Sequence, residues 1–223
     1  MGGDVAGLGE LRGAGLGVLG QEVGQRLTLL GLLNSVHGVE RRLAGVTPGR
    51  GATVSSWNYA EVYEAIAAEQ PDAPALVQGE TRRSWAELMD RSSGLAAGLL
   101  EAGLGHQSKV ANYTYNCCEY LEGVVATLRA GMVPINTNYR YQAAELAYLW
   151  ENSDTEAVIF QGTFTEQVDG LRAQLPLVKL YVHVDDGHGS CPDFAVPFES
   201  LASSGASIPA GTVRTPDDLI MLY

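Results

Sequence analysis

Apolar positions along this chain change period repeatedly after Trp57. Apolar residues three or four positions apart predict amphipathic helices, and short apolar runs between them predict strands. The helices are predicted over 57–70, 85–102, 117–130, 142–152 and 164–174, and the strands over 109–115, 132–136, 156–160, 179–184 and 219–223. Because strands and helices alternate, we predict an α/β fold with a mainly parallel sheet flanked by helices on both faces.

Three local signals refine this prediction. The segment "PALVQGETRRSW" predicts a hairpin that turns at Gly79 and Glu80. Ser84 and Glu87 have the spacing of a capping box at the start of the next helix, and Asn116 with Glu119 has the same spacing. Gly131 is expected just after the end of a helix, where a left-handed backbone favours glycine.

The first 56 residues are a different kind of sequence. Fourteen of the 27 glycines lie there, and the net charge is +1 (five Arg, four acidic residues) against −13 for the rest (nine Lys and Arg, 22 acidic residues). We predict a Gly/Leu-rich, poorly packed extension over 1–56 and a domain over 57–223. "GLGVLG" (Gly15–Gly20) fits a dinucleotide fingerprint, but no apolar strand precedes it, so chance explains it better. Gln25–Leu43 has the spacing of an amphipathic helix, which Gly31 and Gly38 weaken.

Composition narrows the function. A net charge of −12 argues against a nucleic-acid partner. No apolar stretch approaches the roughly 20 residues of a transmembrane helix. Cys117, Cys118 and Cys191 form neither a disulfide framework nor a zinc motif, which favours reduced thiols in a cytoplasmic protein. Asp185–Gly189 is better explained as a solvated turn than as a metal loop.

The passage from Asn116 to Phe160 resembles the N-terminal domain of the adenylate-forming (AMP-binding) enzymes, and most of all the fatty-acid or acyl-CoA ligases. "LRAGMVPINTNYRY" is similar to the second core motif of that superfamily, and "RRSWAEL" to the first, with Trp85 in place of the usual Tyr. The resemblance extends over about Asn58 to Tyr223. It implies a partial N-terminal domain of the adenylate-forming fold.

Tyr139 and Arg140 are the two candidate binding residues. They lie between a predicted strand and the following helix, where open parallel sheets place ligands, and there they would face a substrate or nucleotide channel. The alternative is that Tyr139 packs and that Arg140 pairs with an acidic neighbour such as Glu145.

The resemblance also implies what the full-length family needs. Its members use ATP and Mg²⁺ to activate a fatty or related carboxylic acid to an acyl-adenylate, and then transfer the acyl group to CoA. In that family a strand like "DLIMLY" leads into a phosphate loop with a Lys, which this sequence does not contain. We therefore expect a fragment without catalytic or metal-binding residues, inactive alone and binding ATP, Mg²⁺ or CoA poorly.

The sequence is also compatible with two other functions. One is a non-enzymatic interaction or regulatory module that retains the ligase N-terminal fold. The other is a different α/β enzyme that binds a dinucleotide at Gly15–Gly20.

Overall fold

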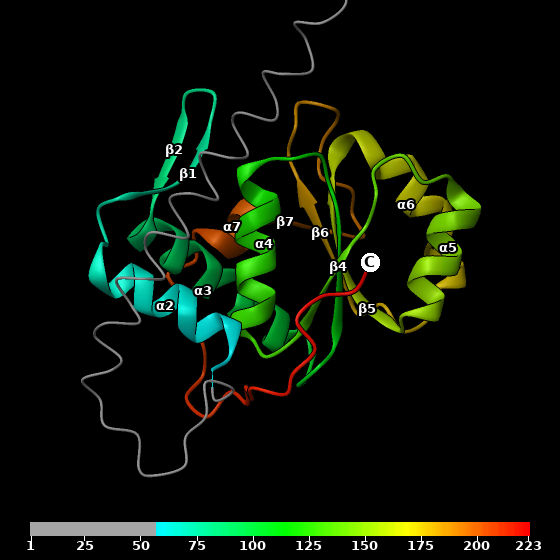
Figure 1. Ribbon diagram of the computed structural model, residues 1–223. Coiled ribbons are helices and arrows are strands. Elements are labelled where there is room, and N and C mark those ends of the chain that lie inside the picture. Colours follow the sequence, from blue (N-terminus) through cyan, green and yellow to red (C-terminus); the bar gives the residue numbers. More distant parts are fainter. Residues whose placement is uncertain (1–56) are drawn as a thin grey trace, which may run out of the picture. The chain divides into compact units, whose positions relative to one another are not determined.

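The computed structural model describes residues 57–223, and the predictions for residues 1–56 lie outside that part of the chain (Figure 1). The main sheet has five parallel strands in the order β4-β3-β5-β6-β7. Their bounds are β3 Lys109–Tyr113, β4 Val133–Asn136, β5 Thr155–Gln161, β6 Leu180–Val184 and β7 Val196–Pro197. The predicted α/β class with a parallel sheet is confirmed.

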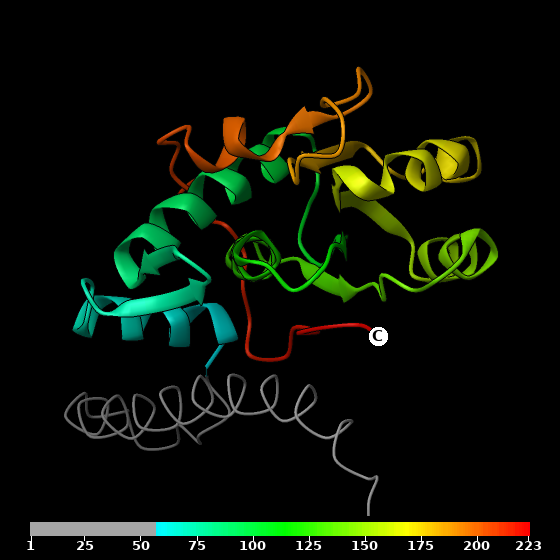
Figure 2. The ribbon, with the colours of Figure 1, turned by 90° about the horizontal axis from the view of Figure 1, so that it is seen from above.

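Helices cover both faces of this sheet (Figures 1 and 2). The helices α3 (Trp85–Glu101), α4 (Cys118–Arg129) and α7 (Phe198–Ala202) lie on one face, with α2 (Tyr59–Glu69) packed outside them. On the opposite face lie α5 (Ala143–Asn152) and α6 (Thr165–Leu171). Neighbouring residues of β5 point to opposite faces, so Ile159 joins the first core and Phe160 the second.

The hairpin and the capping box form as predicted. Strands β1 (Pro74–Gln78) and β2 (Thr81–Ser84) pair antiparallel, and Gly79 takes φ +56° in the turn between them. The Ser84 hydroxyl accepts from the Glu87 amide at 3.2 Å, while the Glu87 carboxylate accepts from the Ser84 amide at 2.7 Å. Helix α3 therefore begins with two of its free amide groups satisfied by short-range bonds.

The predicted cap at Asn116 is wrong. Helix α4 begins at Cys118, and its N-cap is Cys117, which makes no side-chain capping bond. The amide of Cys118 instead donates to the side-chain oxygen of Gln78 at 2.9 Å. The hairpin therefore supplies an acceptor that a sequence-local rule cannot find.

The strand predicted at 219–223, an apolar run expected to be buried, is also wrong. Only Leu222 bridges to β4, through hydrogen bonds to the Pro134 carbonyl (3.0 Å) and from the Asn136 amide (2.9 Å). Leu219 and Ile220 remain 53% and 42% exposed. Beside β4 this segment lies at the edge of the sheet, and among residues 57–223 no further strand pairs with its outer side.

Two further differences concern the last third of the chain. The helix predicted over 164–174 is divided into the 3₁₀ turn η2 (Gly162–Phe164), α6 and the 3₁₀ turn η3 (Arg172–Gln174). The sequence reading missed β7 and α7, which have only two and five residues. Elements this short have too few positions to show a period.

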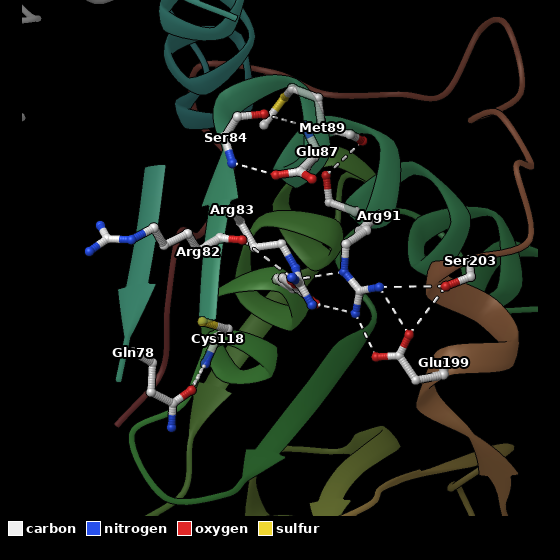
Figure 3. A network of polar contacts seen from close by, with 12 residues as sticks. Gln78, Arg82, Arg83, Ser84, Glu87, Met89, Arg91, Cys118, Glu199 and Ser203 are labelled. Atoms are coloured by element: carbon white, nitrogen blue, oxygen red, sulfur yellow. Dashed lines mark hydrogen bonds and ion pairs between the residues drawn. The ribbon is translucent and has the colours of Figure 1, made fainter. Parts of the chain in front are cut away.

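A polar network joins α3, α4, α7 and the hairpin (Figure 3). The Glu122 side chain, which has no exposed surface, accepts from Arg91 and from Arg83. Arg91 also binds Glu199 at 2.7 Å. Hydrogen bonds with Glu199 and with Glu122 raise the pKa of Arg91, despite the opposing effect of its partial burial. The positive charges of Arg91 and Arg83 thereby compensate the negative charge of the buried Glu122 carboxylate.

Candidate functional site

The candidate site lies at the carboxyl ends of β3, β4 and β5. The chain leaves β3 for α4 on one face of the sheet and leaves β5 for α6 on the other. The strand order therefore reverses between β3 and β5: β4 is added on one side of β3, and β5 and then β6 on the other. Open parallel sheets bind ligands in the crevice at such a point.

Tyr139 and Arg140 both lie at this edge, in the turn after β4. Asn138 shapes the turn, because its side-chain oxygen accepts from the Arg140 amide and its carbonyl accepts from the Tyr141 amide, each at 3.0 Å. Tyr139 is 37% exposed, and Arg140 is also exposed. The guanidinium carbon of Arg140 lies over the Tyr139 ring, 5.2 Å from its centroid.

Arg140 does not pair with Glu145. The Glu145 carboxylate accepts from the Gln142 amide at 2.8 Å, at the start of α5. Among residues 57–223, six of the nine Lys and Arg side chains form ion pairs with carboxylates, and Arg140 forms none. In this strongly acidic part of the chain, the Arg140 guanidinium is thus an available anion-binding group.

Sequence reasoning missed Tyr115, which completes an aromatic cluster at this edge. Tyr115 is 44% exposed, and its ring lies 4.8 Å from that of Tyr139 and 5.2 Å from that of Phe164, measured between centroids. Its amide donates to the Gln161 side chain at 2.6 Å. The available signal was its position just after β3, since parallel strands bring their carboxyl ends to one edge.

Among the described residues, Cys117 and Cys118 are not activated thiols, and no metal cluster is found. Burial raises the pKa of the Cys117 thiol to about 12, and burial also raises that of Cys118. Thiols held in the protonated form are poor nucleophiles. Within residues 57–223 no group of three or more His, Cys, Asp or Glu side chains is arranged to hold a metal ion. In the same range, no helix has both the length and the apolar character to cross a membrane.

Comparison with known proteins identifies the family. A family model described as AMP-binding enzyme matches residues 63–223, so the chain belongs to that family. The predicted resemblance to the adenylate-forming acyl-CoA ligases is confirmed.

Two individual relatives agree with this family match. The chain is 30% identical over 185 residues to the medium-chain acyl-CoA ligase Mig of Mycobacterium avium, a match that covers 77% of this chain and 34% of Mig. It is 29% identical over 170 residues to a medium/long-chain-fatty-acid–CoA/3-oxocholest-4-en-26-oate–CoA ligase of Mycobacterium tuberculosis, covering 74% of this chain and 31% of that ligase. The chain thus spans about a third of the length of these relatives.

A solved structure supports the fold. The Mycobacterium tuberculosis fatty acyl CoA synthetase superposes with a TM-score of 0.63 at 20% identity, covering 74% of this chain and 32% of that one. At this identity the superposition supports the architecture alone.

Proposed function

We propose that this chain is part of an acyl-CoA ligase. The proposed reaction activates a fatty or related carboxylic acid with ATP to an acyl-adenylate and then transfers the acyl group to CoA. The family match over residues 63–223 carries this proposal. The activities for which the two mycobacterial relatives are named support acyl-CoA ligation as the reaction and medium- or long-chain acids as the first substrates to test.

Within that reaction we assign Arg140 and Tyr139 a binding role. ATP and CoA both carry phosphates, and the Arg140 guanidinium, which has no ion-pair partner among residues 57–223, suits a phosphate oxygen. The partly exposed side chains of Tyr139 and Tyr115 provide surface for the remainder of the ligand. Arg140 and Tyr139 are proposed as binding residues only, because adenylate formation also needs donors around the triphosphate that the described residues do not provide.

Mg²⁺ is proposed to enter with ATP, because residues 57–223 offer no cluster of metal ligands of their own. When bound, Mg²⁺ and ATP would supply the activated phosphate. The residues of this chain would contribute orientation and charge at the sheet edge.

The experiment is ATP–pyrophosphate exchange with a panel of medium- and long-chain fatty acids. It compares the 223-residue chain with the same chain extended through the coding sequence that follows it. We expect exchange from the extended protein and none from the 223-residue chain, because loss of a single donor around the reacting group costs about 10²–10³ in rate. Absence of exchange from the extended protein with every acid would overturn the proposal and favour a non-enzymatic module.

A further inference from the structure

Tyr115 is held by one short segment at two points. Gln161, the last residue of β5, accepts from the Tyr115 amide, and Phe164, three residues later, packs against the Tyr115 ring. Strand β3 has already ended at Tyr113, so a side chain rather than a sheet neighbour satisfies this amide. Gln161 itself is only 7% exposed.

The loop after β6 fixes that segment in turn. The Asp186 carboxylate accepts from the Thr163 amide at 3.1 Å. Gly162 approaches the same loop so closely that an added Cβ would lie 2.7 Å from both an Asp186 carboxylate oxygen and the His188 carbonyl. The segment is therefore held between β5 and residues 185–188, which belong to the turn predicted at Asp185–Gly189.

We propose that Gln161 is a positioning residue for the binding edge. Its side-chain oxygen fixes the backbone of Tyr115, Tyr115 sets the angle and depth of the Tyr139 ring, and Tyr139 supports the Arg140 guanidinium. The ligand is a nucleoside phosphate, supplied either as ATP or as the nucleotide end of CoA. This inference rests on the binding role proposed above for Arg140 and Tyr139.

The test uses the 223-residue chain and NMR titration with ATP and, separately, with CoA, because NMR detects weak binding. Gln161→Met keeps the length of the side chain and removes the acceptor, Gln161→Glu restores an acceptor oxygen, and Gln174→Met on exposed η3 is the matched control. We expect Gln161→Met to weaken binding about 3- to 10-fold, the effect of one lost hydrogen bond. Gln161→Glu should recover most of that loss, and the Gln174→Met chain should bind normally.

A double-mutant cycle distinguishes this positioning role of Gln161 from a purely structural one. In a Tyr139→Ala background, Gln161→Met should weaken binding no further, because the proposed route through Tyr139 is already broken. Equal effects of Gln161→Met in both backgrounds would overturn the proposal. The titration in which Gln161→Met weakens binding, with ATP or with CoA, identifies which of the two ligands binds at this edge.

The proposal also has a test that needs no ligand. In the free protein, Gln161→Met should shift the Tyr115 amide and the Tyr139 ring resonances together, and Gln161→Glu should return both toward the wild-type positions. If the wild-type chain binds neither ATP nor CoA, the binding role of this edge fails while these resonances still decide the positioning role. An unmoved Tyr139 ring in Gln161→Met would contradict it.

Discussion

Arg91 binds the fully buried carboxylate of Glu122 in a bidentate manner, with Nε donating to Oε1 and Nη2 to Oε2, each at 2.8 Å. The pair connects α3 to α4, and Glu199 connects the same guanidinium to α7. The buried Glu122 carboxylate is stable only while its arginine partners remain, because an unpaired carboxylate pays a large desolvation cost in the interior.

Arg91→Ala should therefore lower the free energy of unfolding by about 3–5 kcal/mol, because it leaves Glu122 buried with Arg83 alone. Lys179→Ala breaks a more exposed pair with Glu156 and should cost about 0–1 kcal/mol. Urea denaturation measures both. The double variant Arg91→Met with Glu122→Leu should be more stable than Arg91→Ala, and equal losses in the two would contradict this account.

Glu199 adds a pH dependence to the same network. Hydrogen bonds from Arg91 hold the pKa of the Glu199 carboxyl below its ordinary value, against the opposing effect of partial burial. The pKa of this carboxyl is thus lower in the folded than in the unfolded protein, where a Glu side chain titrates at about 4.3. The stabilisation is present above that pH and is lost as pH falls through the folded pKa.

Urea denaturation between about pH 6 and pH 3 should then show a shallower loss of stability for Glu199→Gln than for the wild type. Glu151→Gln, on the exposed surface of α5, controls for the removal of one charge. Parallel curves for wild type and Glu199→Gln would show that the Arg91 contact contributes nothing.

The Ser84 cap predicts a loss of about 1 kcal/mol in unfolding free energy for Ser84→Ala. Ser84→Asp retains an acceptor for the Glu87 amide and should lose much less. Thermal or urea unfolding of the two variants measures the difference, and no loss in Ser84→Ala would mean that α3 begins independently of this cap.

Gly131 and Gly103 separate the cost of a left-handed backbone from the cost of a contact. Both have positive φ, +71° and +83°, but only at Gly131 would a new Cβ collide with the Val213 carbonyl, while Gly103 has open space. Gly103→Ala should cost about 1–2 kcal/mol, and Gly131→Ala about 1–3 kcal/mol more. Similar unfolding free energies for the two variants would show that the 213 segment moves away at little cost.

The local sequence predictions are correct where the interacting residues are close in the sequence and wrong where a distant residue takes part. The Ser84 cap and the glycine at Gly131 depend on neighbours within a few residues, and both are found as predicted. The cap predicted at Asn116 is wrong because Gln78, 40 residues away, supplies the acceptor to Cys118. Short-range rules contain no information about such a partner.

The same limit applies to the candidate site. The position of Arg140 after a strand predicted its place at the carboxyl edge, because parallel topology alone decides which strand ends meet. The contact of Tyr139 with Tyr115, and the support of Tyr115 by Gln161, depend on side-chain packing between β3, β4 and β5. No spacing in the sequence encodes that packing.

The central claim is that Arg140, which forms no ion pair within the described part of the chain, binds the phosphate of a nucleotide substrate at this edge. The direct test is NMR titration of the 223-residue chain with CoA and with ATP. It compares the wild type with Arg140→Ala and with the matched control Arg82→Ala. Arg82 is another exposed arginine that lacks an ion pair among the described residues. We predict weak wild-type binding, with a Kd on the order of 1 mM, that Arg140→Ala weakens about tenfold or more and Arg82→Ala leaves unchanged. Equal affinities in the three proteins, or no wild-type binding of either ligand, would contradict the claim.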